Sequence, residues 1–70
     1  MKLNSIYSND EFKKVSNHLP NWEYDKDYSE NEIDIFDEQL EDVNDLVGYE
    51  NETGIFISDM IYKLRSNPQY

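Results

Sequence analysis

Residues 29–48 decide the fold: they read SENEIDIFDEQLEDVNDLVG. The apolar side chains in this stretch are spaced three and four apart, at Ile33, Phe36, Leu40, Val43 and Val47. This is the period of a helix that buries one face. Ser29 followed three residues later by Glu32 forms a capping box, and Gly48 suits the position just after a last turn. The stretch predicts one helix of about five turns.

A shorter helix is predicted earlier in the chain. Ser8 and Glu11 form a second capping box. The apolar face that follows consists of Phe12, Val15 and Leu19. Pro20 disfavours helical backbone at the residue before it, so this helix is expected to end at Leu19.

The third helix is predicted from Thr53 or Gly54 to Ser66. Its apolar stripe consists of Ile57, Met60, Ile61 and Leu64, and Asn67-Pro68 ends it. No pair of convincing strands is present. We therefore expect one all-α domain over residues 1–70, a small antiparallel bundle of three helices. A short turn of helix near residues 45–49 would make it four.

Cysteine is absent from the 70 residues, which excludes a disulfide scaffold, a thiolate metal site and a cysteine nucleophile. A cysteine-free chain also fits a reducing compartment. The longest apolar run, residues 55–57, is too short for a signal peptide or a membrane span. We expect a cytoplasmic protein that does not associate with membranes.

The acidic residues are concentrated in the middle of the chain. The formal net charge is −10, with 16 acidic and six basic residues. Residues 23–52 hold thirteen carboxylates and one lysine, and each flank carries +1. Disorder is the alternative for so charged a chain, but 14% aromatic residues and clear periodicity favour a fold. This charge repels nucleic acid and anionic membranes, so neither is an expected direct partner.

The predicted long helix carries an acidic ridge. At 100° per residue, six carboxylates fall in one arc opposite the core stripe: Asp34, Asp37, Glu38, Glu41, Asp42 and Asp45. Solvated helix faces usually mix signs to gain ion pairs, and here no lysine relieves the repulsion. We favour a partner-binding ridge over a merely solvated face.

Three apolar or aromatic residues border the ridge, and each has two interpretations. Ile35 and Leu46 are either anchors of an interface or a cover for the side of the core. Tyr49 is either a binding hot spot or the hydrophobic contact that closes the end of the helix.

Catalysis is not expected. A paired-carboxylate mechanism needs two acids in different environments within a cleft, and a three-helix domain of this size offers little cleft. The single histidine, His18, is interpreted as a surface residue. We expect no enzyme activity, no metal and no cofactor.

The layout resembles the small acidic immunity proteins that inhibit nuclease colicins and pyocins. Residues 10–12 are similar to the start of the family's first helix, and residues 29–43 to its acidic second helix. Residues 45–49, DLVGY, are similar to its third-helix motif Asp-Leu-Ile-Tyr-Tyr-Pro. Gly48 and Glu50 stand where the family has its first tyrosine and its proline.

This resemblance implies a four-helix protein that binds an exosite of a basic nuclease through its second helix and a tyrosine. The contacts that it implies are Glu30, Asp34, Asp37, Glu41, Asp45 and Tyr49. The ridge adds Glu38 and Asp42 to these expected partner-binding residues. We therefore predict a stoichiometric inhibitor of a basic nuclease.

The alternative is a DNA mimic from a phage or mobile element. It would block the nucleic-acid channel of a restriction, CRISPR or other DNA-binding protein. An acidic adaptor domain with an unrelated partner is a third interpretation.

Overall fold

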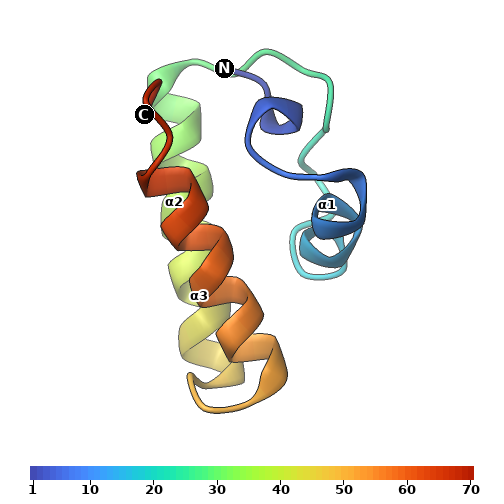
Figure 1. The fold of residues 1–70 in the computed structure, drawn as a ribbon, viewed down its shortest axis with the longest axis vertical. Coiled ribbons are helices and arrows are strands. Elements are labelled where there is room, and N and C mark those ends of the chain that lie inside the picture. Colours follow the sequence, from blue (N-terminus) through green and yellow to red (C-terminus); the bar gives the residue numbers. More distant parts are fainter.

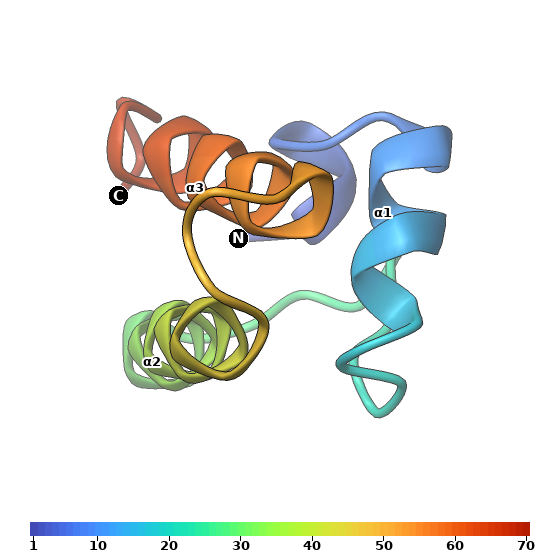
Figure 2. The ribbon, with the colours of Figure 1, turned by 90° about the horizontal axis from the view of Figure 1, so that it is seen from below.

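The computed structural model describes residues 1–70. It consists of a short 3₁₀ turn, η1 (Leu3–Ser5), and three helices, α1 (Asn9–Ser16), α2 (Glu30–Val47) and α3 (Glu52–Arg65). Helices α2 and α3 form an antiparallel hairpin, and α1 lies to one side of it (Figure 1). Seen along the hairpin, α1 and the N-terminal segment close the open side between the two long helices (Figure 2). The predicted all-α, three-helix bundle is confirmed.

Helix α2 begins and ends where the local sequence predicts. The Ser29 hydroxyl accepts a hydrogen bond from the Glu32 amide (3.2 Å), and the Glu32 carboxylate accepts one from the Ser29 amide (3.0 Å). Gly48 ends the helix with φ at 87°, a backbone conformation that glycine adopts without a steric penalty. Residues 45–47 therefore belong to α2, and no separate helix forms near residues 45–49.

The other two helices differ from prediction at one end each. The capping box of α1 is present, but the α-helix ends at Ser16. The following turn tightens, and the His18 amide donates to the Val15 carbonyl at 3.0 Å. Helix α3 begins at Glu52, before the predicted start, because the Asn51 side chain caps it by accepting from the Gly54 amide at 2.8 Å.

The core lies where the three helices meet. The α2 stripe is confirmed and packs with residues of α1 and α3. The buried apolar residues of the three helices are Phe12, Val15, Ile33, Phe36, Leu40, Val43, Ile57, Met60 and Leu64. The other predicted core residues, Leu19, Val47 and Ile61, pack against its edge and are partly buried.

The N-terminal segment completes the core. The helical spacing of apolar residues did not predict this contribution. Leu3 is fully buried, and the Tyr7 hydroxyl donates to the Met60 carbonyl at 2.7 Å. The Asn4 amide donates to the Tyr24 carbonyl at 3.1 Å, which ties this segment to the connection between α1 and α2. These bonds join residues far apart in sequence, so they have no local signal.

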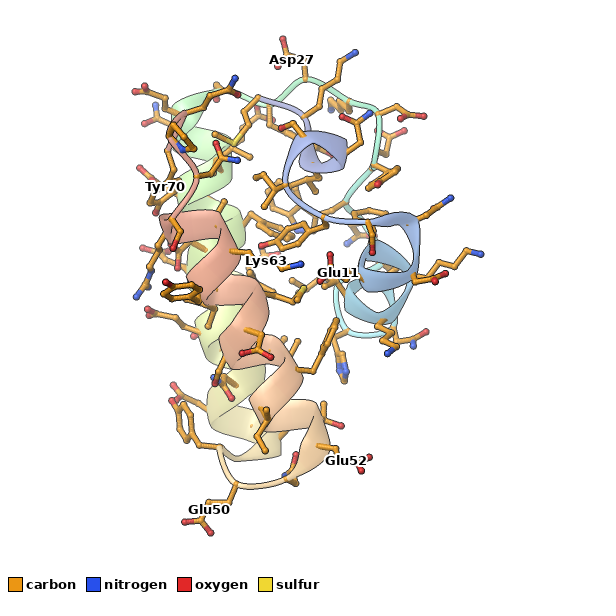
Figure 3. The ribbon with its side chains drawn as sticks, in the orientation of Figure 1. Glu11, Asp27, Glu50, Glu52, Lys63 and Tyr70 are labelled. Carbon is orange, nitrogen blue, oxygen red and sulfur yellow. The ribbon has the colours of Figure 1, made fainter.

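Ion pairing also links α1 to the hairpin. Lys63 of α3 donates to Glu11 of α1 at 2.5 Å, and Figure 3 shows the two side chains meeting between the helices. Hydrogen bonds from Lys63 and from the Ser8 amide lower the pKa of Glu11.

Across the described chain, no helix is long and apolar enough to cross a membrane.

Candidate functional site

One side of α2 presents six exposed carboxylates, which we call the acidic face: Glu30, Asp34, Glu38, Glu41, Asp42 and Asp45. The helical period places them within an arc of about 120° opposite the buried stripe. At a rise of 1.5 Å per residue, the acidic face is about 22 Å long. The structure thus brings together seven of the eight predicted partner-binding residues, counting Tyr49 beside the face, and leaves out Asp37.

Asp37 was expected in the exposed arc, and the structure corrects this. Its relative exposure is only 5%. Arg65 donates to its two carboxylate oxygens at 2.9 and 3.1 Å, and the Tyr70 hydroxyl donates to it at 2.7 Å. Figure 3 shows Tyr70 lying beside the upper half of α2. Asp37 occupies the edge of the arc nearest α3, so the C-terminal residues cover it.

The hydrogen bonds in this contact shift the pKa values of both Asp37 and Tyr70. Burial opposes ionisation of Asp37, but the hydrogen bonds from Arg65 and Tyr70 outweigh it, and the pKa of Asp37 falls below its ordinary value of 3.8. The same hydrogen bond to Asp37 raises the pKa of Tyr70 to about 12. Asp37 is therefore a structural anion that holds the end of α3.

Arg65 relieves part of the repulsion that the sequence suggested was unrelieved. Its guanidinium also donates to Glu41, which keeps half of its side-chain surface exposed. One cation is shared by two carboxylates, so the group retains a net negative charge. The other five carboxylates of the acidic face form no ion pair: Glu30, Asp34, Glu38, Asp42 and Asp45.

Exposed apolar and aromatic side chains border the acidic face. Tyr49 is 59% exposed, and its hydroxyl donates to Asp45. This hydrogen bond raises the pKa of Tyr49. Tyr49 therefore does not fold back as a buried contact at the end of α2. Leu46 and Ile35, along the opposite edge, are 86% and 49% exposed, so they do not cover the core.

An open cavity of about 370 Å³ lies between α2 and α3 beside Tyr49. It is lined in part by Asn44, which is 2% exposed. The Asn44 Nδ2 donates to the Ser58 hydroxyl at 2.8 Å, and its Oδ1 has no donor within the protein. Sequence reasoning missed this residue. The available signal was a polar residue on the core-facing side of the helix, four positions after Leu40.

The described residues contain no cluster of three or more histidine, aspartate and glutamate side chains that could hold a metal ion. His18 is exposed beyond the end of α1.

Comparison with known proteins finds no matching family model, no matching curated protein and no matching solved structure.

Proposed function

We propose that this protein is a stoichiometric inhibitor that binds a basic nuclease through the acidic face of α2. The observation that carries the proposal is a row of six exposed carboxylates, five of them without an ion-pair partner. Like charges at this spacing repel one another and oppose helix formation. A complementary basic surface removes that repulsion and steers association. We place this action in the cytoplasm, since a chain without cysteine fits a reducing compartment.

The apolar borders support a binding role rather than a purely solvated one. Tyr49 lies at one edge of the acidic face, and Ile35 and Leu46 lie at the other, all exposed. Tyrosine is enriched among interface hot spots, which are surrounded by contacts that exclude water. Charge steers encounter, and such anchors slow dissociation.

A DNA mimic is the second candidate, and the linear charge density supports it. Six charges along about 22 Å of helix give one charge per roughly 4 Å. A single strand of B-DNA carries one phosphate per about 3.4 Å of axis. A mimic would occupy the nucleic-acid channel of its target, whereas an exosite inhibitor would leave that channel open.

The test compares two charge-reversed baits of equal net charge. Glu38→Lys/Asp42→Lys changes unpaired residues of the acidic face, and Glu23→Lys/Asp59→Lys changes exposed acids elsewhere. Each bait and the wild type captures proteins from a lysate of the source cells. The captured protein is identified by mass spectrometry, purified, and assayed for cleavage of DNA and RNA.

We expect a nuclease that is inhibited at one-to-one stoichiometry. Reversal at the acidic face should weaken its binding by about 100-fold, because like charges opposed at an interface cost several kcal/mol. The control pair should bind as the wild type does. A captured partner without nuclease activity, or unchanged binding by the Glu38→Lys/Asp42→Lys protein, would contradict the proposal.

A competition assay with labelled DNA separates the two candidates. An exosite inhibitor stops cleavage while DNA stays bound, and Tyr49→Ala should weaken it. A mimic displaces the DNA, and its affinity falls steeply with added salt.

A further inference from the structure

Residues 66–70, which follow α3, fold back beside the start of α2 (Figure 1), and we call them the strap. Their sequence, SNPQY, contains no charged side chain. The hydrogen bond from the Tyr70 hydroxyl to Asp37, at 2.7 Å, is the only one that joins the strap to α2. We propose that the strap opens on a hinge while the bundle stays folded, and that the closed strap restricts access to the acidic face.

The strap forms a turn of its own. Pro68 has no amide to donate, and it disfavours helical backbone at Asn67, so α3 does not continue into the strap. The Tyr70 amide donates to the Asn67 carbonyl at 3.0 Å, and the Gln69 amide donates to the Asn67 Oδ1 at 2.9 Å. These bonds lie within the strap and persist when it swings away from α2. Segments with so few contacts to the rest of a protein open locally.

Opening of the strap leaves the hairpin of α2 and α3 joined, because Arg65 lies before the hinge. Its guanidinium keeps both bonds to Asp37, at 2.9 and 3.1 Å. The hydrogen bond to Asp37 is also the main cause that raises the pKa of Tyr70 to about 12. The Tyr70 hydroxyl is therefore protonated at neutral pH and remains a donor that can close the strap again.

The closed strap forms one wall of an open cavity of about 370 Å³ at the start of α2. Tyr70 lines this cavity from the strap, and Ile33, only 1% exposed, lines it from α2. Glu30 and Asp34 of the acidic face line the same cavity. A partner that lies along the whole acidic face therefore meets the strap at this end. This consequence for binding rests on the proposed function, whereas the opening itself does not.

The first test measures opening without any partner. A neutral gadolinium chelate in solution broadens the NMR signals of exposed methyl groups, so broadening of the Ile33 methyl signals reports the open form. Tyr70→Phe removes only the hydroxyl, and loss of a hydrogen bond to a charged group should raise the open population about tenfold. We expect the broadening at Ile33 to increase several-fold. The matched control is Tyr62→Phe, at a tyrosine of α3 that is 73% exposed, and it should leave the broadening unchanged.

Tyr70→Ala is a second variant, which removes the aromatic wall of the cavity as well as the hydroxyl. It should give the largest broadening at Ile33. Amide hydrogen exchange at Leu40, which is fully buried in the core, should stay as slow as in the wild type, because the bundle does not unfold. Unchanged broadening at Ile33 in either Tyr70 variant would overturn the inference. So would broadening that is accompanied by faster exchange at Leu40.

The second test measures binding of the captured nuclease. A protein whose competent form is only partly populated binds with an affinity reduced by that fraction. Tyr70→Phe should therefore bind up to about tenfold more tightly than the wild type, and Tyr62→Phe should bind equally.

Failure of this inference is distinguishable from failure of the proposed function. If the strap opens in the first test but no captured partner is a nuclease, the hinge stands and the proposed function fails. If a nuclease is inhibited but Tyr70→Phe binds it only as tightly as the wild type does, the proposed function stands and the restriction by the strap is overturned.

Discussion

At the scale of single residues, the contact between Asp37, Arg65 and Tyr70 determines how the end of the chain is held. Asp37 is buried, while Asp34 one turn before it and Glu41 one turn after it are exposed. The difference lies in the angle around α2, since Asp37 faces α3. Two donors from Arg65 and one from Tyr70 then outweigh the cost of burying its charge. Charge-assisted hydrogen bonds of this kind are roughly twice as strong as neutral ones.

We predict that Asp37→Asn lowers the free energy of unfolding by about 1–3 kcal/mol, the range expected for lost hydrogen bonds to a charged group. The measurement is urea unfolding followed by the fluorescence of Trp22, whose ring packs against Phe36 in the core. The matched control is Asp42→Asn on the exposed surface of α2, which should change stability by less than about 0.5 kcal/mol. Equal losses in the two variants would show that Asp37 has no special structural role.

The same variants give a pH dependence of known sign. The pKa of Asp37 in the folded protein is lowered below 3.8. Its stabilising contribution is therefore complete above that value and is lost as the pH falls through the lowered pKa. The stability difference between wild type and Asp37→Asn should be constant above about pH 5 and shrink below about pH 4. A difference that grows on acidification would contradict the lowered pKa.

At the scale of elements, the hairpin of α2 and α3 depends on a close backbone approach at Gly54. This glycine lies in the first turn of α3, where alanine is the better helix former by about 1 kcal/mol. A Cβ atom at this position would lie 1.8 Å from the Gly48 carbonyl oxygen and 2.8 Å from its carbon. The end of α2 thus leaves no room for a side chain at the start of α3.

Gly54→Ala should therefore destabilise the protein, against its helix propensity, by about 1–3 kcal/mol as typical for overpacking. Thermal unfolding followed by far-UV circular dichroism measures the change. Asp59→Ala, on the exposed surface of α3, is the control and should stay within about 0.5 kcal/mol. A Gly54→Ala protein more stable than wild type would mean that the hairpin opens without cost.

At the scale of the whole molecule, folding leaves most of the acidic charge uncompensated. The structure contains four ion pairs, two of which share Arg65, against a net charge of −10. A large net charge destabilises the compact state through self-repulsion, and salt screens this repulsion. The acidic face therefore lowers the stability of the free protein.

Added NaCl should raise the urea midpoint of the wild-type protein. The double variant Glu38→Gln/Asp42→Asn removes two unpaired charges of the acidic face, so its midpoint in low salt should be higher and its response to NaCl smaller. Chemical unfolding at several NaCl concentrations measures both effects. A midpoint that falls with salt would show that the four ion pairs outweigh the repulsion.

The helices themselves could be predicted because their signals are local. The Ser29–Glu32 capping box, the stripe that includes Phe36 and Leu40, and Gly48 as the end of α2 all act within a few turns. The end of α1 was misplaced because the helix tightens into a turn after Ser16, before it reaches Pro20. The start of α3 was misplaced because its capping residue is Asn51. The carboxylates of the acidic face that form no ion pair were also predictable, since the angle of a side chain around the axis of one helix follows from its spacing in the sequence.

The sequence by itself determined the helical content, the buried stripe and the concentration of carboxylates on α2, because each depends on periodicity within one element. Only the tertiary structure decided that Asp37 is a buried anchor and that Asn44 keeps an unpaired oxygen. Both depend on which edge of α2 meets α3. The partner of Asp37, Arg65, is 28 residues away along the chain, and no local pattern specifies a contact across that separation.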